Sequence, residues 1–459
     1  MTDATIFAPP ADPDEARAAG ERLRESCPFD RHSVLPDRDG VDPVAITLSV
    51  NADRIEELAA VRVGRMISSP FAFLRGSAKL MAADLAGTPV TGVNVQICGD
   101  AHAANFGLYA SPERRLVFDL NDFDETVHGP WEWDLRRLAT SLVVAGREAG
   151  ADDEVCRKAA RHAARAYRAA VHEMATLPVM DAWYVINDDT TLGHFDLDDL
   201  QETFDRVAKK ARKNTSHRAA SKFAQRLETD EFHFVEDRPI LRRVTGDERT
   251  SILAGFDEYG HGLGPELRFL LSRFSVADVA FRVSGLGSVG NRCYVVLLHG
   301  NGSGDPTDVL ILQVKEARAS ALADFASAGP YEHQGERIVR GQRWMQTVND
   351  ILLGWTTIDG RPCLVRQFRD MKGSVDPALL KPHQLDDYAR VTGAVLGRAH
   401  CQSVDPKLLH GYLGAGKLGD DFDRATEAFA VVYADRTEAD HAALCQAVKN
   451  GVVAATVGI

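Results

Sequence analysis

The 459-residue sequence lacks paired cysteines, long apolar runs and an excess of basic residues, and each absence excludes a class of protein. Its seven cysteines include no CxxC pair, and their odd number argues against a disulfide framework, so we expect reduced thiols in a cytoplasmic protein. No run of about 18 apolar residues is present, which excludes a membrane-spanning helix. The N-terminal segment has neither the basic nor the apolar region of a signal peptide. The net charge of −13 argues against general nucleic-acid binding but leaves room for a local basic pocket that binds a phosphorylated ligand.

The first half of the sequence is mainly helical in its pattern. Asp12 and Pro13 supply an N-cap and a first-turn proline for a short helix that ends near Ser26. A helical pattern from residue 53 to 85 is interrupted at SSPFAFLRG, and charged helical sequence continues to about residue 230. Long helices are predicted at residues 131–148 and 152–176.

The pattern turns to strands near residue 275. The segment VADVAFRVSGLGSVGNRCYVVLLHG predicts a strand, a glycine turn and a second strand, and DVLILQVKEA predicts a third. A helix over about residues 331–352, a strand pair around GWTTIDGRPCLVRQF and further helix from about residue 384 follow. The predicted fold class is therefore α+β.

The segments CGDAHAANFG and NDFD contain residues of the types that phosphoryl transfer requires. That chemistry needs a carboxylate to orient or deprotonate the acceptor hydroxyl, and an amide and a further carboxylate to hold Mg²⁺ against the phosphates. Asp100 and Asn105 are five residues apart on one predicted loop, as in the kinase pattern H-R-D-L-x-x-x-N. Asp122 follows at the end of an apolar strand, where a second metal ligand would be presented. An isolated Asp–Asn pair is usually an Asx-turn, but several such positions in one register favour a catalytic loop.

This stretch resembles small-molecule kinases of the aminoglycoside and choline kinase type. Their catalytic loop reads roughly GDxHxxN, and their metal aspartate lies in a D-[FW]-[DE] strand end. The resemblance implies that Asp100 is the catalytic base, with His102 beside it in the same loop. It implies that Asn105 and Asp122 are Mg²⁺ ligands, and that Asp124 is a second metal ligand or an outer partner of the site.

Four further residues have expected roles around this loop. By the same resemblance, Asp134 begins a helix and braces the loop through its backbone N–H groups, whereas Asp119 is expected to be structural. Arg65 and Arg75 flank the SPFAFLRG motif, which has no counterpart in ordinary kinases. They could neutralise a substrate phosphate or carboxylate, or anchor the loop by pairing with its aspartates, and the structural role is favoured.

A second motif lies late in the chain, where Gly285, Gly287, Ser288 and Gly290 belong to a G-x-G-x-x-G pattern. A dinucleotide-binding fold would require a helix directly after these glycines, but NRCYVVLL predicts a strand. Strand, glycine turn and strand are the geometry of a lid over nucleotide phosphates, because backbone N–H groups can approach where no Cβ intervenes.

The strands after this turn supply the other predicted nucleotide contacts. Lys315 ends a strand that resembles the V-A-I-K strand, whose lysine contacts the α- and β-phosphates. Glu336 on the next helix is the predicted ion-pair partner of this lysine, with Glu332 as the alternative. The strand that carries Arg366 and Gln367 would occupy the hinge position, where the adenine edge meets the protein.

If both motifs form one site, the chain is a circularly permuted, protein-kinase-like, two-lobe fold. Residues 1–52 would be a partly disordered extension, 53–269 a helical catalytic lobe, 270–375 a β-rich nucleotide lobe and 376–459 helices that pack on the catalytic lobe. The late helix in LDDYARVTGAVLGRAHCQS would then run toward the catalytic loop, and its end would have to lie near the start of the 53–100 region.

The segments GRMISSPFAFLRGSA, CGDAHAANFG and VRQFRDMKGS resemble an uncharacterised bacterial family, domain of unknown function 2252, over nearly the whole chain. That family name supplies no activity. The sequence departs from protein kinases in having Gly99 where H-R-D has arginine, and in lacking an A-P-E segment. Both departures argue against control by activation-loop phosphorylation.

The function expected from these residues is ATP- and Mg²⁺-dependent phosphoryl transfer to a small-molecule hydroxyl. AMP transfer on the same fold, with the nucleotide reversed, and a non-catalytic nucleotide-binding protein are the alternatives. A metallophosphoesterase is disfavoured, because it needs a dinuclear site with further histidines. The expected partners are a nucleotide and a small-molecule acceptor, with no nucleic acid and no membrane, and oligomeric state is left open.

Overall fold

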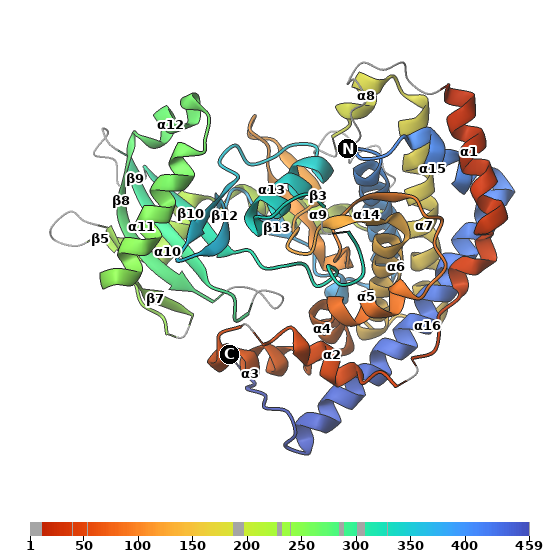
Figure 1. Cartoon of the computed structure of the whole chain (residues 1–459), viewed down its shortest axis with the longest axis horizontal. Helices are drawn as coiled ribbons and strands as arrows, with labels where there is room; N and C mark the ends of the chain where they lie inside the picture. The colour runs from red at the N-terminus through yellow and green to blue at the C-terminus, as the bar shows by residue number, and fades with distance from the viewer. Residues whose placement is uncertain are drawn as a thin grey trace.

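The computed structural model describes residues 12–38, 40–52, 54–186, 197–226, 232–238, 240–283, 289–300, 308–327 and 329–458. They form a mixed α+β fold with antiparallel sheets (Figure 1). The helices are α1 Pro13–Ser26, α2 Pro43–Ser49, α3 Glu56–Met66, α4 Pro70–Gly76, α5 Ala78–Ala86, α6 Trp131–Glu148, α7 Asp153–Thr176, α8 Val179–Trp183, α9 Gln201–Arg212, α10 Ser216–Phe223, α11 Gly246–His261, α12 Pro265–Leu271, α13 Gln334–Met345, α14 Leu385–His400, α15 Pro406–Leu413 and α16 Gly416–Lys449. The strands are β1 Asn94–Ile97, β2 Phe106–Ala110, β3 Leu116–Leu120, β4 Val127–Pro130, β5 Ala224–Arg226, β6 Phe232–Phe234, β7 Leu241–Arg243, β8 Phe274–Arg282, β9 Cys293–Gly300, β10 Val309–Glu316, β11 Gly354–Ile358, β12 Arg361–Gln367 and β13 Gly373–Ser374.

The helical part of the molecule is built around α6, which is buried along nearly its whole length. Its apolar residues pack against α7, α14 and α16, so the longest helices lie side by side (Figure 1). Trp131 at the start of α6 stacks on Tyr167 of α7 with ring centroids 5.5 Å apart. This packing fixes the first turn of α6, the turn that contains Asp134.

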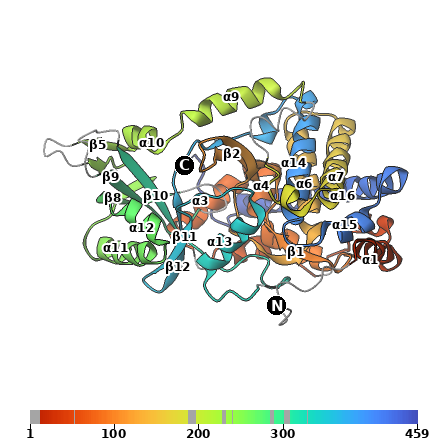
Figure 2. The same cartoon turned by 90° about the horizontal axis from the view of Figure 1, so that it is seen from above.

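The β-rich part is a six-stranded antiparallel sheet in the order β11-β12-β10-β9-β8-β7. Alternate residues face opposite sides: Val296 and Val314 pack with α11 residues, whereas Val295 and Ile311 pack with α10 residues. Both faces are therefore covered, which explains why β9 and β10 are almost continuously apolar. The view from above shows α10 and α11 on opposite sides of this sheet (Figure 2).

Two sequence-based predictions need correction. The segment SSPFAFLRG interrupts the helical pattern only at its start, because α3 ends at Met66 and Pro70–Gly76 is itself helix α4. Ser69 caps it by accepting a hydrogen bond from the Ala72 N–H at 3.1 Å, and Pro70 occupies the first helical position. Helix also does not continue to residue 230, because α10 ends at Phe223 and is followed by β5.

Other predictions are confirmed. Helix α1 begins after the Asp12 cap, whose side chain accepts from the Asp14 N–H at 2.8 Å, and ends at Ser26. Helices α6 and α7, strands β1, β3, β8, β9 and β10, and the β11–β12 pair occupy the expected positions. All seven cysteines lie in the described part of the chain and are free thiols. Across the described ranges, no helix has both the length and the apolar character needed to cross a bilayer.

Candidate functional site

The loop after β1 is held by a carboxylate from α6. Asp134 is buried and accepts hydrogen bonds from the backbone N–H groups of Cys98 at 2.7 Å and Gly99 at 3.0 Å. Gly99 has φ of +77°, and a Cβ at this position would lie 2.3 Å from the Glu125 carbonyl oxygen, so only glycine fits. The predicted brace by Asp134 is confirmed, and it sets the direction in which the next residue, Asp100, leaves the loop.

Asp100 is held on both sides. Its carboxylate Oδ1 accepts a hydrogen bond from Nε of Arg137, and its backbone carbonyl accepts one from the Asn105 side-chain amide at 2.8 Å. Burial raises the pKa of Asp100 to about 7; Arg137 opposes this shift, and Glu125 and Asp122 add to it. A carboxyl group that titrates near neutrality is suited to general-base chemistry.

Arg137 was not identified from the sequence. It lies three residues after Asp134 and therefore on the same side of α6, which is the signal that could have found it. Its guanidinium is buried and also donates to the Leu74 carbonyl oxygen at 2.9 Å. Arg137 thereby links α6, the Asp100 loop and helix α4, which contains the SPFAFLRG motif.

His102 lies beside Asp100, with Nε2 3.8 Å from Asp100 Oδ2. Burial lowers its pKa well below the usual range, and the charges of Arg137 and Arg75 act in the same direction. The ring is therefore neutral at physiological pH. It packs edge-on against Phe71, and within the described residues its Nδ1 has no hydrogen-bond partner.

The two motifs meet at Asp124. Lys315, buried on β10, forms an ion pair with Asp124 Oδ2 through its Nζ. Burial opposes the charged form of the lysine, but Asp124 and Asp122 outweigh it and raise the pKa of Lys315. Burial also acts to raise the pKa of Asp124, but Lys315 outweighs this and lowers it. Arg337 of α13 further fixes this strand end by donating to the Asp124 carbonyl oxygen at 2.8 Å.

The predicted Lys315–Glu336 ion pair is wrong. Glu336 lies in the first turn of α13, where it pairs with Arg340 one turn later at 3.3 Å. The alternative, Glu332, is exposed. Lys315 reaches Asp124 instead, because β10 presents its side chain to the loop after β3 rather than to the start of α13.

The remaining metal-ligand candidates are Asp122 and Asn105, and the Asn121 N–H donates to the Asn105 backbone carbonyl at 3.0 Å. Asp122 follows β3, and its Oδ1 lies 3.4 Å from the Asp124 N–H. Asn105 is held through its side-chain nitrogen, so the amide oxygen is the atom that could bind a cation. Among the residues that the structure describes, no three His, Cys, Asp or Glu side chains are arranged to hold a metal ion by themselves. Asp119 is buried and forms an ion pair with Arg398 at 3.1 Å, which agrees with the structural role predicted for it.

Only the end of the predicted glycine turn can be placed. Gly285, Gly287 and Ser288 lie outside the described residues. Gly290 has φ of +88°, and its carbonyl oxygen accepts from the Ile55 N–H at 2.9 Å. A Cβ on Gly290 would lie 2.8 Å from the Cβ of Arg54, so the turn before β9 packs directly against the segment that precedes α3.

Arg366 and Gln367 line a second cavity of about 70 Å³ at the end of β12. Gln367 is held by Asp350, which accepts its backbone N–H at 2.6 Å and its side-chain amide at 2.7 Å. Arg366 donates to the Gln313 side chain at 3.0 Å. Lys372 lines the same cavity, and burial, followed by the charge of Arg366, lowers its pKa to about 7.

Helix α14 connects this region back to the Asp100 loop. Tyr388 near its start donates to the Ala103 carbonyl oxygen at 2.6 Å, and His400 at its end lies 3.3 Å from the Asp134 carboxylate. Ser403, just beyond the helix, accepts from the Gln96 N–H of β1 at 2.8 Å. The end of the helix therefore contacts Asp134 and β1, which lies at the end of the 53–100 region, whereas the permuted arrangement predicts contact with the start of that region.

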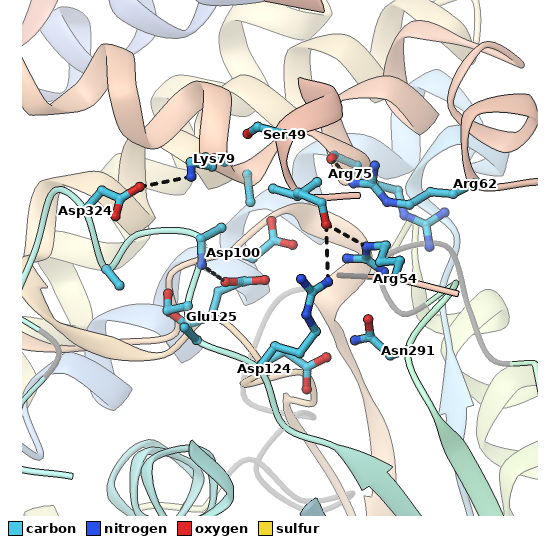
Figure 3. Close-up of a pocket in the computed structure, with 18 of the residues that line it drawn as sticks. Ser49, Arg54, Arg62, Arg75, Lys79, Asp100, Asp124, Glu125, Asn291 and Asp324 are labelled. Carbon is cyan, nitrogen blue, oxygen red and sulfur yellow. Dashed lines mark hydrogen bonds and ion pairs between the residues drawn. The ribbon is translucent and has the colours of Figure 1, made fainter. Parts of the chain in front are cut away.

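A larger cavity of about 240 Å³ opens beside Asp100 and Asp124 (Figure 3). Arg54, Arg62 and Arg75 lie together on one side of it. Asp100 and Asp124 therefore line the same cavity as these three arginines, which we call the basic wall. Of the three, only Arg75 is a candidate from the sequence.

Comparison with known families gives one result. The model of an uncharacterised protein family conserved in bacteria, DUF2252, matches residues 54–447. Neither the curated proteins nor the solved structures provide a match. Because the family model covers most of the sequence, including the Asp100 loop, Asp122 to Asp124 and Lys315, the chain belongs to the DUF2252 family.

Proposed function

We propose that the protein is an ATP- and Mg²⁺-dependent phosphotransferase with a circularly permuted, kinase-like fold, and that it acts on a small-molecule hydroxyl. The observation that carries this proposal is the Lys315–Asp124 ion pair, which joins groups 191 positions apart. A nucleotide-binding lysine and a metal-binding carboxylate must both lie at the phosphates, so their contact is what a single ATP site requires.

The course of the chain supports the permuted arrangement. Strands β8, β9 and β10, helix α13 and the β11–β12 pair follow one another in the order of a kinase nucleotide lobe. Helix α14 then returns to the Asp100 loop, although that loop comes almost 300 residues earlier in the sequence. Arg366 and Gln367, which the proposal assigns to the adenine, line a cavity of about 70 Å³.

The donor set fits Mg²⁺. Asp122 and Asp124 provide carboxylates and Asn105 an amide oxygen, which are the hard oxygen ligands that Mg²⁺ prefers. Few protein ligands suffice, because Mg²⁺ at such sites takes the rest of its coordination from phosphates and water. When bound, the ion would neutralise charge on the transferring phosphoryl group.

Asp100 is the group that would receive the acceptor proton. As the acceptor oxygen forms its bond to the γ-phosphorus, the bond from that phosphorus to the β–γ bridging oxygen breaks and ADP leaves. Arg137 and Asp134 hold the carboxylate in position during this step. Lys315 would stabilise the negative charge of the nucleotide phosphates.

Calorimetric titration with ATP and Mg²⁺, followed by analysis of the nucleotide products, tests this proposal. Wild type should bind one ATP per chain, and Asp122→Ala should weaken that binding at least tenfold. Asp435→Ala, which removes a carboxylate that is 62% exposed and pairs with Arg147, should bind as wild type does. ADP formation supports phosphoryl transfer and pyrophosphate supports AMP transfer, whereas a wild-type protein that binds no ATP rejects the proposal.

A further inference from the structure

The cavity beside Asp100 is lined by an unusual number of cationic side chains for a chain of net charge −13. They come from separate segments: the loop before α3, helices α3, α4 and α5, and the segment after β10. They are Arg54, Arg62, Arg75, Lys79 and Arg318.

Acidic residues line the same cavity, but most are already neutralised. Asp124 pairs with Lys315, Asp100 with Arg137, and Asp324 with Lys79. Glu316 pairs with Arg292 and Arg361. Most of these cationic partners lie outside the cavity lining, so these four carboxylates already have other counter-charges. Glu125 also lines the cavity, and its charge acts to raise the pKa of Arg54 and Arg62 against the larger, lowering effect of burial.

Two of the arginines, Arg54 and Arg62, donate hydrogen bonds to neutral groups. Arg54 donates to the carbonyl oxygens of Val50 and Val289. Arg62, only 2% exposed, donates to the Asn51 side chain at 3.1 Å and to the Gly76 carbonyl oxygen. Burial lowers the pKa of Arg62 to about 9, and the positive charge of Arg54 adds to this shift.

The cavity also contains polar atoms that the protein leaves unused. The Nε atoms of Arg62 and Arg75 are buried, and within the described ranges neither has a hydrogen-bond partner. The same holds for Oδ1 of Asn291, which lines the cavity opposite Asp100 (Figure 3). Buried charged donors that make no hydrogen bond are costly, and an anion between the arginines would accept hydrogen bonds from them.

We propose that this cavity binds a phosphate group, and that the acceptor of the proposed transfer is a small alcohol that itself carries a phosphate. The second part rests on the proposed function; the first does not. Planar guanidinium groups bind phosphate oxygens in pairs, and three of them converge here. Asp100 lines the cavity and Lys315 does not, which favours the acceptor rather than the nucleotide as the source of the phosphate.

The size of the cavity limits the ligand. At about 240 Å³ it lies below the range of roughly 300–1,000 Å³ for drug-sized ligands, so it suits a phosphate with a few further heavy atoms. Such a ligand would place its hydroxyl between the arginines and Asp100. The unused Asn291 oxygen could accept a hydrogen bond from a second hydroxyl.

Titration with inorganic phosphate in the absence of nucleotide tests the anion site. Wild type should bind one phosphate per chain, and Arg75→Gln should weaken the dissociation constant about tenfold. Arg75→Gln is the primary variant because Nε of Arg75 has no hydrogen-bond partner within the described part of the chain, and its guanidinium lies 6.0 Å from the Phe71 ring centroid. Circular dichroism confirms that the variant is folded. Arg62→Gln should weaken binding at least as much, with circular dichroism confirming that it is folded.

Arg24→Gln is the matched control for Arg62→Gln, because both arginines donate to neutral oxygens, and those that Arg24 reaches, the carbonyls of Gly411 and Tyr412, do not line the cavity. Its phosphate affinity should equal that of wild type. Wild-type protein that binds no phosphate, or Arg75→Gln protein that binds it as wild type does, overturns the anion site.

Repeating the titration in saturating Mg²⁺ and ATP identifies the source of the phosphate. Binding of phosphate and ATP at the same time supports an acceptor subsite. Competition between them, with ATP binding also weakened in Arg75→Gln, assigns the cavity to a nucleotide phosphate and overturns the acceptor class. If phosphate binds but ATP does not, the anion site stands and the proposed function falls.

Discussion

The loop half of the candidate site, residues 98–134, and the sheet half, residues 274–367, fix their functional groups in different ways. In the loop half, Asp134 binds the Cys98 and Gly99 N–H groups and Asn105 binds the Asp100 carbonyl, all within one short stretch. In the sheet half, Lys315 depends on Asp124 from the distant loop half. A group fixed by its neighbours in sequence can be predicted from spacing, whereas a group fixed across the fold cannot.

The largest expected effect comes from removing the candidate base in the loop half. Asp100→Asn should lower the transfer rate by roughly 10²–10⁴-fold, because the acceptor proton then has no carboxylate to receive it. ATP affinity should change little, since the proposal gives Asp100 no contact with the nucleotide. Product formation at saturating ATP measures the first quantity and calorimetry the second. A rate within twofold of wild type would remove Asp100 from the mechanism.

If Asp134 braces the loop half, replacing it should lower the free energy of unfolding. Asp134→Asn leaves one of the two loop N–H groups without its carboxylate oxygen and should cost about 3 kcal/mol in the free energy of unfolding. Asp152→Asn is the matched control, because it changes an aspartate that caps α7 and asparagine caps helices equally well. Urea denaturation compares the two. Equal, small losses would show that Asp134 does not brace the loop.

The dependence of the transfer rate on pH should follow the protonation of Asp100. Its raised pKa of about 7 means that the proton-accepting carboxylate is the minor form below pH 7 and the major form above it. The rate should therefore rise about tenfold per pH unit below 7 and level off above it. Arg137→Met removes the cation that opposes this shift and should move the midpoint to higher pH. A rate that is flat between pH 5 and 8 would contradict this assignment.

The smallest expected effect concerns the sheet half. Glu336→Ala should leave ATP affinity within twofold of wild type, because Glu336 pairs with Arg340 rather than with Lys315. The loss of that surface pair should cost no more than about 0.5 kcal/mol in unfolding free energy. Calorimetry and urea denaturation measure both quantities. A tenfold loss of ATP affinity would restore Glu336 as the partner of Lys315 in the nucleotide-bound protein.

The helices and strands with strong patterns could be predicted from the sequence. The contact of Asp134 with the loop could also be predicted, because spacing within one motif determines it. The sequence was not sufficient for the partner of Lys315, since helix and strand patterns do not say which way a strand end faces. The basic wall was mostly missed for the same reason. Arg54 and Arg62 are ordinary surface-type residues by sequence and are brought to Asp100 only by tertiary packing.

The SPFAFLRG motif illustrates a different limit. The predicted break in the helical pattern is present between Met66 and Pro70, but the motif itself forms a helix, because serine and proline also begin helices. As α4, the motif supplies Arg75 to the cavity and the Leu74 carbonyl oxygen to Arg137. Its role is therefore both to line the site and to support it.

A double-mutant cycle on ATP affinity tests most directly whether the two halves form one site. Asp122→Ala in the loop half and Lys315→Met in the sheet half should each weaken binding of ATP with Mg²⁺ at least tenfold. The combined variant should lose less than the product of the two single losses, because both residues act on the same phosphates. A single ATP site shared between the halves would be contradicted if the loss of affinity in the double variant equalled the product of the two single losses. It would also be contradicted if either single change left ATP affinity as in wild type.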